Sequence, residues 1–265
     1  MNYHQPKPLG PNPNRTIQDY KNRYKCKKRD WDIPPEEVKP PLWIEGISEF
    51  SKNVPTHNDI WIIEEVFKGA TGGFYVECGA NNGAYGCTYL LEKDYKWRGI
   101  LIEAIPALYE QCVENRPRDT CINACLDSAE GETEFIEYKE YKGCSGIKKN
   151  FGKHRRYVNT DTDDHESFLI KTTTLAKVLD EHKAPTVIDY LALDVERSEL
   201  EILKAFPFDS YKFKAMSIEM GGATFKELTN LIKDNGYIRV DNQFNRILHE
   251  AYFIHKDFIT IDYKV

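Results

Sequence analysis

Hydrophobic positions recur along the chain with two different spacings, and both become regular from residue 57 onward. Short runs rich in Val, Ile, Phe and Tyr alternate with segments of about ten residues whose apolar positions recur every third or fourth residue. The first spacing is typical of buried strands and the second of amphipathic helices. We predict strands over residues 74–78, 98–104, 120–127, 131–138, 167–172, 186–195, 213–220, 237–241 and 250–256. We predict helices over residues 58–70, 87–96, 107–116, 174–182, 198–206 and 224–236.

The alternation of strands and helices predicts an α/β fold. Strands that alternate with helices of this length form a parallel, doubly wound sheet with helices on both faces. We expect the two final strands to form a hairpin at one edge of that sheet. The segment 140–165 is polar and rich in turn residues, which predicts a loop. Ligands of such sheets bind at the carboxyl ends of the strands, so the residues that follow the strands are the candidates for a site.

Proline is concentrated in the first part of the chain. Nine of the thirteen prolines lie within residues 1–55, and proline removes backbone donors and disfavours regular structure. We therefore predict a Pro-rich, extended N-terminal arm over residues 1–55 and one domain over residues 56–265. The arm contains the basic and aromatic run "YKNRYKCKKRDWD". We interpret this run as a solvated or packing segment rather than a nucleic-acid site, with Trp31 and Trp43 against the domain.

Charge and cysteine usage narrow the classes of partner. The formal net charge is −6 and the sequence pI about 5.7, which disfavours nucleic acid and anionic membrane surfaces as partners. The sequence has no run of 18 apolar residues, and its start lacks the apolar stretch of a signal peptide. Its seven cysteines match no zinc spacing, so we expect reduced thiols in a cytoplasmic protein. The oligomeric state stays open.

The stretch "FYVECGANNGAYG" joins the first predicted strand to a glycine-containing turn. A dinucleotide fingerprint G-x-G-x-x-G that starts at Gly79 needs glycine two and five positions further on, where the chain has Asn81 and Ala84. The sequence also lacks the phosphate loop G-x-x-x-x-G-K-[ST]. A pyrophosphate is therefore poorly provided for, and the negative charge of Glu77 at the start of the turn would repel it.

S-adenosylmethionine (SAM) fits this turn better, because it carries a ribose and an ammonium group but no phosphate. Glu103 ends the second predicted strand, 24 positions after Gly79, where an acidic residue can hydrogen-bond the hydroxyls of a ribose. Glu77 can receive the ammonium directly or through water, and glycine lets the backbone approach the methionine part. The candidate cofactor-binding residues of this region are Glu77, Gly79, Ala80, Asn81, Asn82, Gly83 and Glu103.

Several runs of the sequence resemble the FkbM family of SAM-dependent methyltransferases. They are "FYVECGANNGAYGCTYLLEKDYKWRGILIEAIPALYEQCVENRP", "ACLDSAEGETEF", "TTTLAKVL" and "LALDVERSELEIL", and together they cover about residues 72–220. The resemblance implies the class I methyltransferase fold, a Rossmann-like sheet of six parallel strands and a last antiparallel one. It also implies methylation of a hydroxyl group on a sugar, a glycan or a small natural product. The chain departs from the family at Arg197 and Ser198, which follow "DVE" where the family usually has glycine.

Two further residues are candidates beside the cofactor. Asp127 ends the third predicted strand, where its carboxylate can accept from the adenine amine or form part of the turn. Ser145 lies in "KGCSGI" and matches a serine that is common at this point of the family. The resemblance thus implies a place for Ser145 near the cofactor or the acceptor.

Acidic residues follow two of the later strands. Asp194 and Glu196 lie at the end of the strand over 186–195, and Glu219 lies at the end of the strand over 213–220. An attacking hydroxyl must lose its proton, so a carboxylate base or a bound cation assists the reaction. We predict Asp194, Glu196 and Glu219 as catalytic residues, with Asp194 and Glu219 as ligands of Mg²⁺ or Mn²⁺. The alternative for Asp194 is a cap of the following helix.

Two other function classes stay open. A metal-dependent glycosyltransferase that uses a nucleotide sugar would explain the spacing of Asp194 and Glu196, which resembles D-x-D, but it gives no purpose to the glycine turn or to Glu103. A non-catalytic scaffold with a methyltransferase fold gives none to these carboxylates or to Glu77. On the favoured interpretation the partner is a small-molecule or glycan acceptor, which the sequence does not identify.

Overall fold

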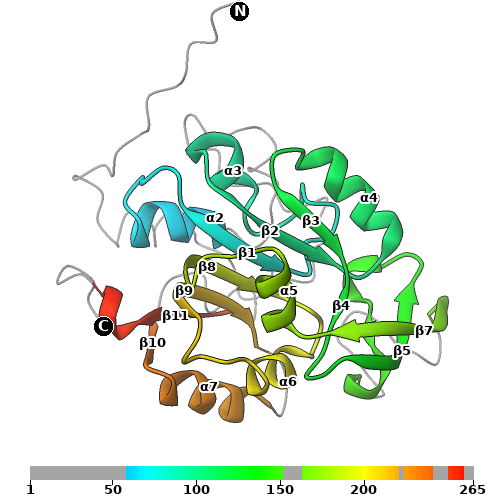
Figure 1. Cartoon of the computed structure of the whole chain (residues 1–265). Coiled ribbons are helices and arrows are strands. Elements are labelled where there is room, and N and C mark those ends of the chain that lie inside the picture. The colour runs from blue at the N-terminus through cyan, green and yellow to red at the C-terminus, as the bar shows by residue number, and fades with distance from the viewer. Residues whose placement is uncertain (1–57, 152–162, 221–223, 241–249, 260–265) are drawn as a thin grey trace, which may run out of the picture.

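The computed structural model describes residues 58–151, 163–220, 224–240 and 250–259, which form a large sheet, a small sheet and the helices around them (Figure 1). The predicted arm over residues 1–55 lies outside these residues. The six cysteines within them are free thiols. None of the helices that the structure describes is long and apolar enough to cross a membrane.

A sheet of seven strands forms the centre of the molecule. Its strands are β1 (Phe74–Cys78), β2 (Arg98–Glu103), β3 (Thr120–Asn123), β8 (Val187–Leu193), β9 (Lys212–Glu219), β10 (Tyr237–Val240) and β11 (Glu250–His255). Their order is β10-β11-β9-β8-β1-β2-β3. All pairs are parallel except the two that β11 makes, with β9 and with β10. The predicted sheet of six parallel strands and one antiparallel strand is therefore confirmed, with the predicted hairpin at its edge.

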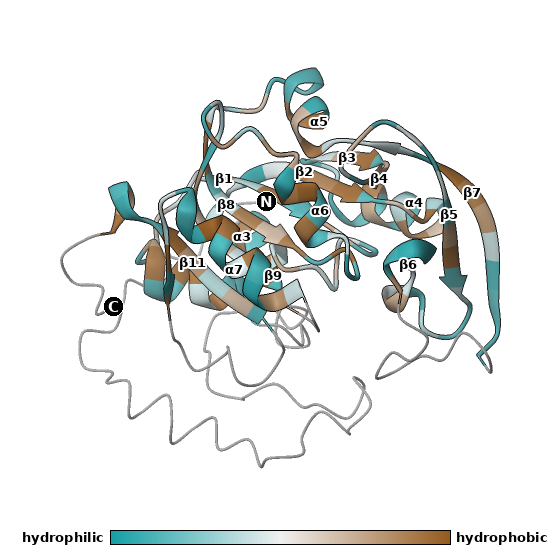
Figure 2. Cartoon of the chain, turned by 90° about the horizontal axis from the view of Figure 1, so that it is seen from below, coloured by the Kyte–Doolittle hydropathy of each residue, from teal (hydrophilic) through white to brown (hydrophobic). Residues whose placement is uncertain are grey.

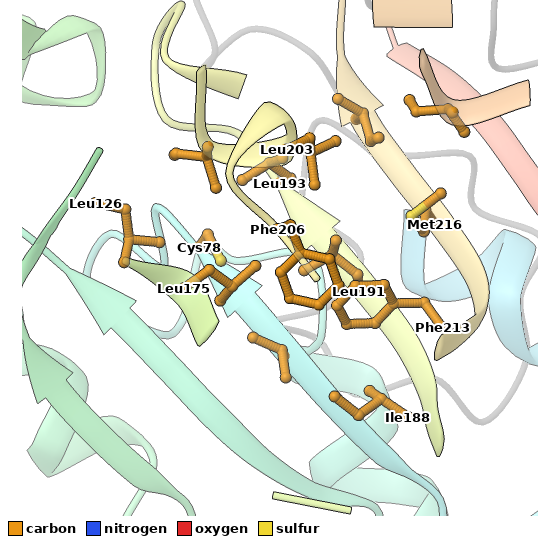
Figure 3. Packing of buried hydrophobic residues seen from close by; sticks show 14 of the residues in the cluster. Cys78, Leu126, Leu175, Ile188, Leu191, Leu193, Leu203, Phe206, Phe213 and Met216 are labelled. Atoms are coloured by element: carbon orange, nitrogen blue, oxygen red, sulfur yellow. The ribbon is translucent and has the colours of Figure 1, made fainter. Parts of the chain in front are cut away.

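Helices cover both faces of this sheet. They are α2 (Asn58–Ile60), α3 (Tyr89–Tyr95), α4 (Pro106–Asn115), α5 (Leu175–Glu181), α6 (Glu199–Lys204) and α7 (Phe225–Asp234). On one face, residues of α5, α6 and α7 pack against β1, β8 and β9, and Figure 3 shows Leu203 beside Leu193 within this cluster. On the other face, residues of α2, α3 and α4 pack against Tyr75 and Tyr190. Tyr75 and Val76 belong to opposite faces because side chains alternate along a strand.

The predicted strand over 120–127 is wrong as a single element. It divides at Ala124 into β3 and a two-residue strand β4 (Cys125–Leu126), which leaves the large sheet and pairs with β7 (His165–Thr173). The small sheet has the order β4-β7-β5-β6, where β5 is Gly131–Tyr138 and β6 is Gly146–Ile147. Figure 2 shows β5, β6 and β7 together at one side of the molecule. The other two strands predicted in this region, 131–138 and 167–172, are confirmed.

The first predicted helix is shorter than expected. It begins as α2 and continues as a π-helix, η4 (Trp61–Val66), rather than as an α-helix up to residue 70. Lys68 and Gly69 have positive φ angles of 51° and 82°, and such angles cannot continue a right-handed helix. The buried side chains of Trp61, Ile62 and Ile63 fix this segment on the sheet.

Candidate cofactor and acceptor site

The turn after β1 lies directly against the end of β8. Gly79 has a φ of 81°, and its backbone N–H and that of Ala80 donate to the carbonyl of Ile102 at 2.9 and 3.1 Å. A Cβ atom at Gly79 would overlap the carbonyl oxygen of Asp194. Glycine is thus required here for two reasons, a left-handed backbone and the close approach of two strand ends. The contact places the turn beside the predicted catalytic carboxylates.

The rest of the turn is held by its own polar groups. The side-chain oxygen of Asn82 accepts from the N–H groups of Ala84 and Tyr85, both at 3.0 Å, and Asn81 adopts a left-handed φ of 52°. Gly83 also has a left-handed φ of 73°, and a Cβ atom there would lie 2.8 Å from atoms of Cys112 and Arg116 on the α4 side. Asparagine suits this turn because it tolerates the left-handed region and hydrogen-bonds nearby backbone.

Glu103 lies at the end of β2, as predicted, and is 6% exposed. One of its carboxylate oxygens accepts from the N–H of Asn81 at 2.8 Å, and the other accepts from the N–H of Ile105 at 2.9 Å. Burial raises the pKa of Glu103 to about 7. Two ionised carboxylate oxygens offer about four acceptor positions, so Glu103 keeps acceptor capacity for the two hydroxyls of a ribose.

Glu77 lies in a different environment from the one predicted for a ligand of the SAM ammonium. Its carboxylate is 1% exposed and accepts from the N–H of Cys87 and from the hydroxyl of Thr88. Burial raises the pKa of Glu77. In this structure Glu77 holds the segment before α3 onto β1, and a contact with a cofactor stays a prediction.

A fully buried arginine holds the turn by hydrogen bonds to its backbone and to neighbouring segments. Arg116 follows α4 and donates to the carbonyl of Gly83 at 2.9 Å and to the hydroxyl of Thr88 at 3.0 Å. Its guanidinium forms an ion pair with Asp119 at 3.0 Å, and both side chains are 0% exposed. The same group donates to the hydroxyl of Tyr75 at 2.5 Å. This network links the turn, α3 and β1, and it sits beneath the candidate cofactor residues.

Asp127 and Ser145 are both buried, and each side chain makes hydrogen bonds within the protein. The carboxylate of Asp127 accepts from the N–H of Ser128 at 2.8 Å and from the ammonium of Lys149 at 2.6 Å. The hydroxyl of Ser145 accepts from the N–H of Tyr138 at 3.0 Å. The Ser128 contact corresponds to one of the two predicted roles of Asp127, a part of the turn. Contacts of Asp127 and Ser145 with a cofactor or an acceptor stay predictions.

The three predicted catalytic carboxylates meet at the ends of β8 and β9. Asp194, Glu196 and Glu219 are all half-buried, and each offers a carboxylate oxygen within 4.8 Å of the others. Burial, and next the charge of Glu219, raise the pKa of Asp194 well above its usual range. This arrangement attracts cations and can accept a proton.

Two buried carboxylates that the sequence did not reveal stand behind this group. Glu250 begins β11, pairs in register with Glu219 and is 4% exposed. Asn58 hydrogen-bonds Glu250 and also accepts from the hydroxyl of Tyr252 at 2.5 Å. Burial and then Glu219 raise the pKa of Glu250 well above its usual range. The sequence feature that could have indicated Glu250 is its place as the single glutamate at the start of the mostly apolar strand "EAYFIH".

Glu199 is the second of these carboxylates, and it shapes the loop after β8. Its carboxylate accepts from the N–H of Val195 at 3.0 Å and from the N–H of Arg197 at 3.2 Å. Glu196 and Arg197 have positive φ angles of 61° and 85°, which L-residues adopt at a cost. Glu199 thus fixes the loop before α6. The N-cap residue of α6 is Ser198, without a side-chain capping bond, so the alternative role of Asp194 as the cap of this helix is not observed.

The left-handed backbone at Arg197 leads to a first prediction. Replacing Arg197 with glycine should raise the free energy of unfolding by about 0.5–1 kcal/mol, because glycine adopts this φ without steric cost. Urea unfolding at pH 7 measures the change. Lys226→Gly in α7 is the matched control and should lower stability by about 1 kcal/mol. If Arg197→Gly and Lys226→Gly lowered the free energy of unfolding equally, the expected relief of backbone strain at position 197 would be contradicted.

The pKa of Glu103 leads to a second prediction. Since burial raises it from about 4.5 to about 7, the folded protein holds a proton in this range that the unfolded chain releases. The resulting stability is fully present below pH 4.5 and lost as the pH rises through about 7. Glu103→Gln removes this titration, so its stability relative to wild type should improve from pH 5 to pH 8 in urea unfolding. The exposed Glu132→Gln is the control, and a pH-independent difference for Glu103→Gln would disprove the prediction.

Comparisons with known proteins identify the family of this chain. A model of the methyltransferase FkbM domain matches residues 77–239, and no curated protein matches the chain. The solved structures that the chain matches include a TehB-like SAM-dependent methyltransferase from Corynebacterium glutamicum (10% identity, 75% of this chain and 88% of that chain, TM-score 0.41). They also include Aeropyrum pernix fibrillarin with natively bound SAM (12%, 70% and 67%, 0.39) and M. capricolum TrmK with S-adenosyl-homocysteine (11%, 80% and 73%, 0.40). Because the domain model matches more than half of the chain, this protein belongs to the FkbM methyltransferase family.

Proposed function

We propose that this protein is a SAM-dependent O-methyltransferase that methylates a hydroxyl group of a sugar, a glycan or a small natural product. One observation carries the proposal: the backbone contact between Gly79 and Asp194 sets the candidate cofactor turn directly beside three converging carboxylates. Family membership supports SAM as the cofactor. The contact brings a methyl donor and proton-accepting groups to the same edge of the sheet.

The residues of the turn fit SAM better than a dinucleotide. Glu103 retains acceptor capacity for ribose hydroxyls after its bonds to Asn81 and Ile105. Asn81 stands where a dinucleotide loop needs glycine, and its side-chain oxygen is used within the turn, where it accepts from the N–H of Asn82. SAM, when bound, supplies an electrophilic methyl group. The protein's part is to orient the acceptor hydroxyl and to take its proton.

The three carboxylates also fit a hard divalent cation. Mg²⁺ and Mn²⁺ prefer oxygen ligands, and the oxygens of Asp194, Glu196 and Glu219 lie within 4.8 Å of one another. Asp194 and Glu219 would hold the ion, which would lower the pKa of a coordinated hydroxyl and screen the repulsion between the carboxylates. Glu196 would accept the proton of the hydroxyl as the methyl group is transferred. Family membership sets the glycosyltransferase alternative aside.

The third prediction tests cofactor and chemistry together. SAM and S-adenosyl-homocysteine should raise the melting temperature of the full chain, whereas UDP-sugars should not. Formation of S-adenosyl-homocysteine is then measured against a panel of mono- and oligosaccharides and small hydroxylated compounds. Asp194→Asn should reduce turnover about 100-fold or more with SAM affinity little changed. The exposed Asp209→Asn should retain full activity.

Two outcomes would contradict this proposal. Equal turnover by Asp194→Asn and wild type would remove the catalytic role of Asp194. SAM binding without transfer to any acceptor of the panel would favour a non-catalytic protein with a methyltransferase fold.

The fourth prediction concerns the cation. Mn²⁺ should bind the apo chain with an affinity measurable by electron paramagnetic resonance, and Glu219→Gln should weaken this binding at least tenfold because one charged ligand is lost. Treatment with EDTA should lower turnover, and Mg²⁺ should restore it. The exposed Glu132→Gln is the matched control. Full activity after EDTA treatment, with no Mn²⁺ signal from bound ion, would exclude the metal while leaving SAM-dependent transfer intact.

A further inference from the structure

The segment Lys142–Phe151, which we name the strap, contacts the loops that follow four different strands. It contains β6 between two short 3₁₀-helices, Lys142–Cys144 and Lys148–Asn150. After β1, a Cβ atom at Gly143 would lie 3.4 Å from the amide nitrogen of Asn81. After β2, Ile105 shares an apolar cluster with Ile147 of the strap. The loops after β4 and β8 are contacted by polar side chains. The strap thus borders the candidate site along the carboxyl ends of these four strands.

Two adjacent strap residues reach loops on opposite sides of the site. Lys149 donates to Asp127 at 2.6 Å, and its side chain is 56% exposed, so water and salt screen this ion pair. Asn150 donates through its amide nitrogen to the hydroxyl of Ser198 at 2.8 Å. Ser198 is 1% exposed, so water competes little for this second bond. The Asn150–Ser198 hydrogen bond is therefore a polar attachment whose acceptor is shielded from solvent.

The strap also rests on the loop that carries the catalytic carboxylates. A Cβ atom at Gly146 would lie 3.3 Å from the carbonyl oxygen of Glu196 and 3.4 Å from its Cβ atom. Ser198 lies two residues after Glu196, in the same loop with its left-handed backbone. A bond from the strap to Ser198 thus fixes Glu196 from one side, while Glu199 fixes the loop from the other.

We propose that Asn150 and Ser198 are positioning residues whose hydrogen bond closes the strap over the cofactor turn and holds the Glu196 loop in place. The inference rests on the proposed function, because it assumes that SAM occupies the site that the strap borders. SAM then enters and leaves only when the strap separates from the loop after β8. The Asn150–Ser198 bond consequently slows both association and dissociation, and it links occupancy of the cofactor turn to the position of Glu196.

The fifth prediction follows from this double effect. In Ser198→Ala and in Asn150→Ala, the association and dissociation rate constants of tritiated SAM should both rise about fivefold, the effect of one neutral hydrogen bond. A residue with a merely structural role would raise only the dissociation rate, because damage to a pocket does not speed entry. Rapid mixing followed by filtration gives the association rate, and a chase with unlabelled SAM gives the dissociation rate.

Three variants complete the experiment. Ser198→Thr keeps the hydroxyl and should restore wild-type rates. The double variant Ser198→Ala/Asn150→Ala should match the single variants, because both remove the same bond. The exposed Ser167→Ala in β7 should leave the rates unchanged. Two results would overturn the inference: unchanged rate constants in both single variants, or faster dissociation of SAM without faster association. In either case, SAM binding by the wild-type protein would still support SAM as the cofactor. No SAM binding by wild type would overturn both.

Discussion

The site depends on the approach of two strand ends in the centre of the sheet. β1 and β8 pair in parallel register, and the contact between Gly79 and the carbonyl of Asp194 continues that pairing beyond the last ladder position. Any side chain at position 79 would separate the strands at the point where cofactor turn and carboxylates meet. Gly79 therefore fixes the distance between the candidate cofactor turn after β1 and the carboxylates after β8.

The buried polar groups behind the turn show how so short a loop is held in place. Burying a charge without a partner is costly, yet Arg116 and Asp119 are both fully buried and paired. Hydroxyls of Tyr75 and Thr88 satisfy further donors of the guanidinium. At the other end of the site the balance is different. There Asp194 and Glu250 lie close to Glu219, and burial together with the charge of Glu219 raises the pKa of Asp194 and of Glu250. One part of the molecule thus pairs its buried charges, whereas the other brings carboxylates together.

Much of this arrangement was accessible from the sequence. Strand ends of a doubly wound sheet share one edge, which was enough to bring Asp194, Glu196 and Glu219 together and to place Glu103 at the end of β2. The sequence could not show that Glu77 bonds the residues just before α3. The alternation of side chains along a strand assigns Glu77 to one face of the sheet, but it does not show which segment covers that face. Glu250 was missed since its place depends on the antiparallel register of β11 with β9. The break at Ala124 was missed because one apolar run serves both β3 and β4, and only tertiary pairing separates them.

The insertion of β11 between β9 and β10 has a consequence for how the protein acquires its structure. Asn58 reaches Tyr252 by a hydrogen bond that spans 194 positions of the sequence, and Glu250 joins the carboxylates of β8 and β9 from the same strand. During synthesis the parallel strands can assemble first, but β9 then presents an open edge until β11 leaves the ribosome. Contacts of such long sequence separation form slowly, and open strand edges are prone to aggregation. Strand β11 therefore completes the acidic side of the site and, in the same step, covers the open edge of β9.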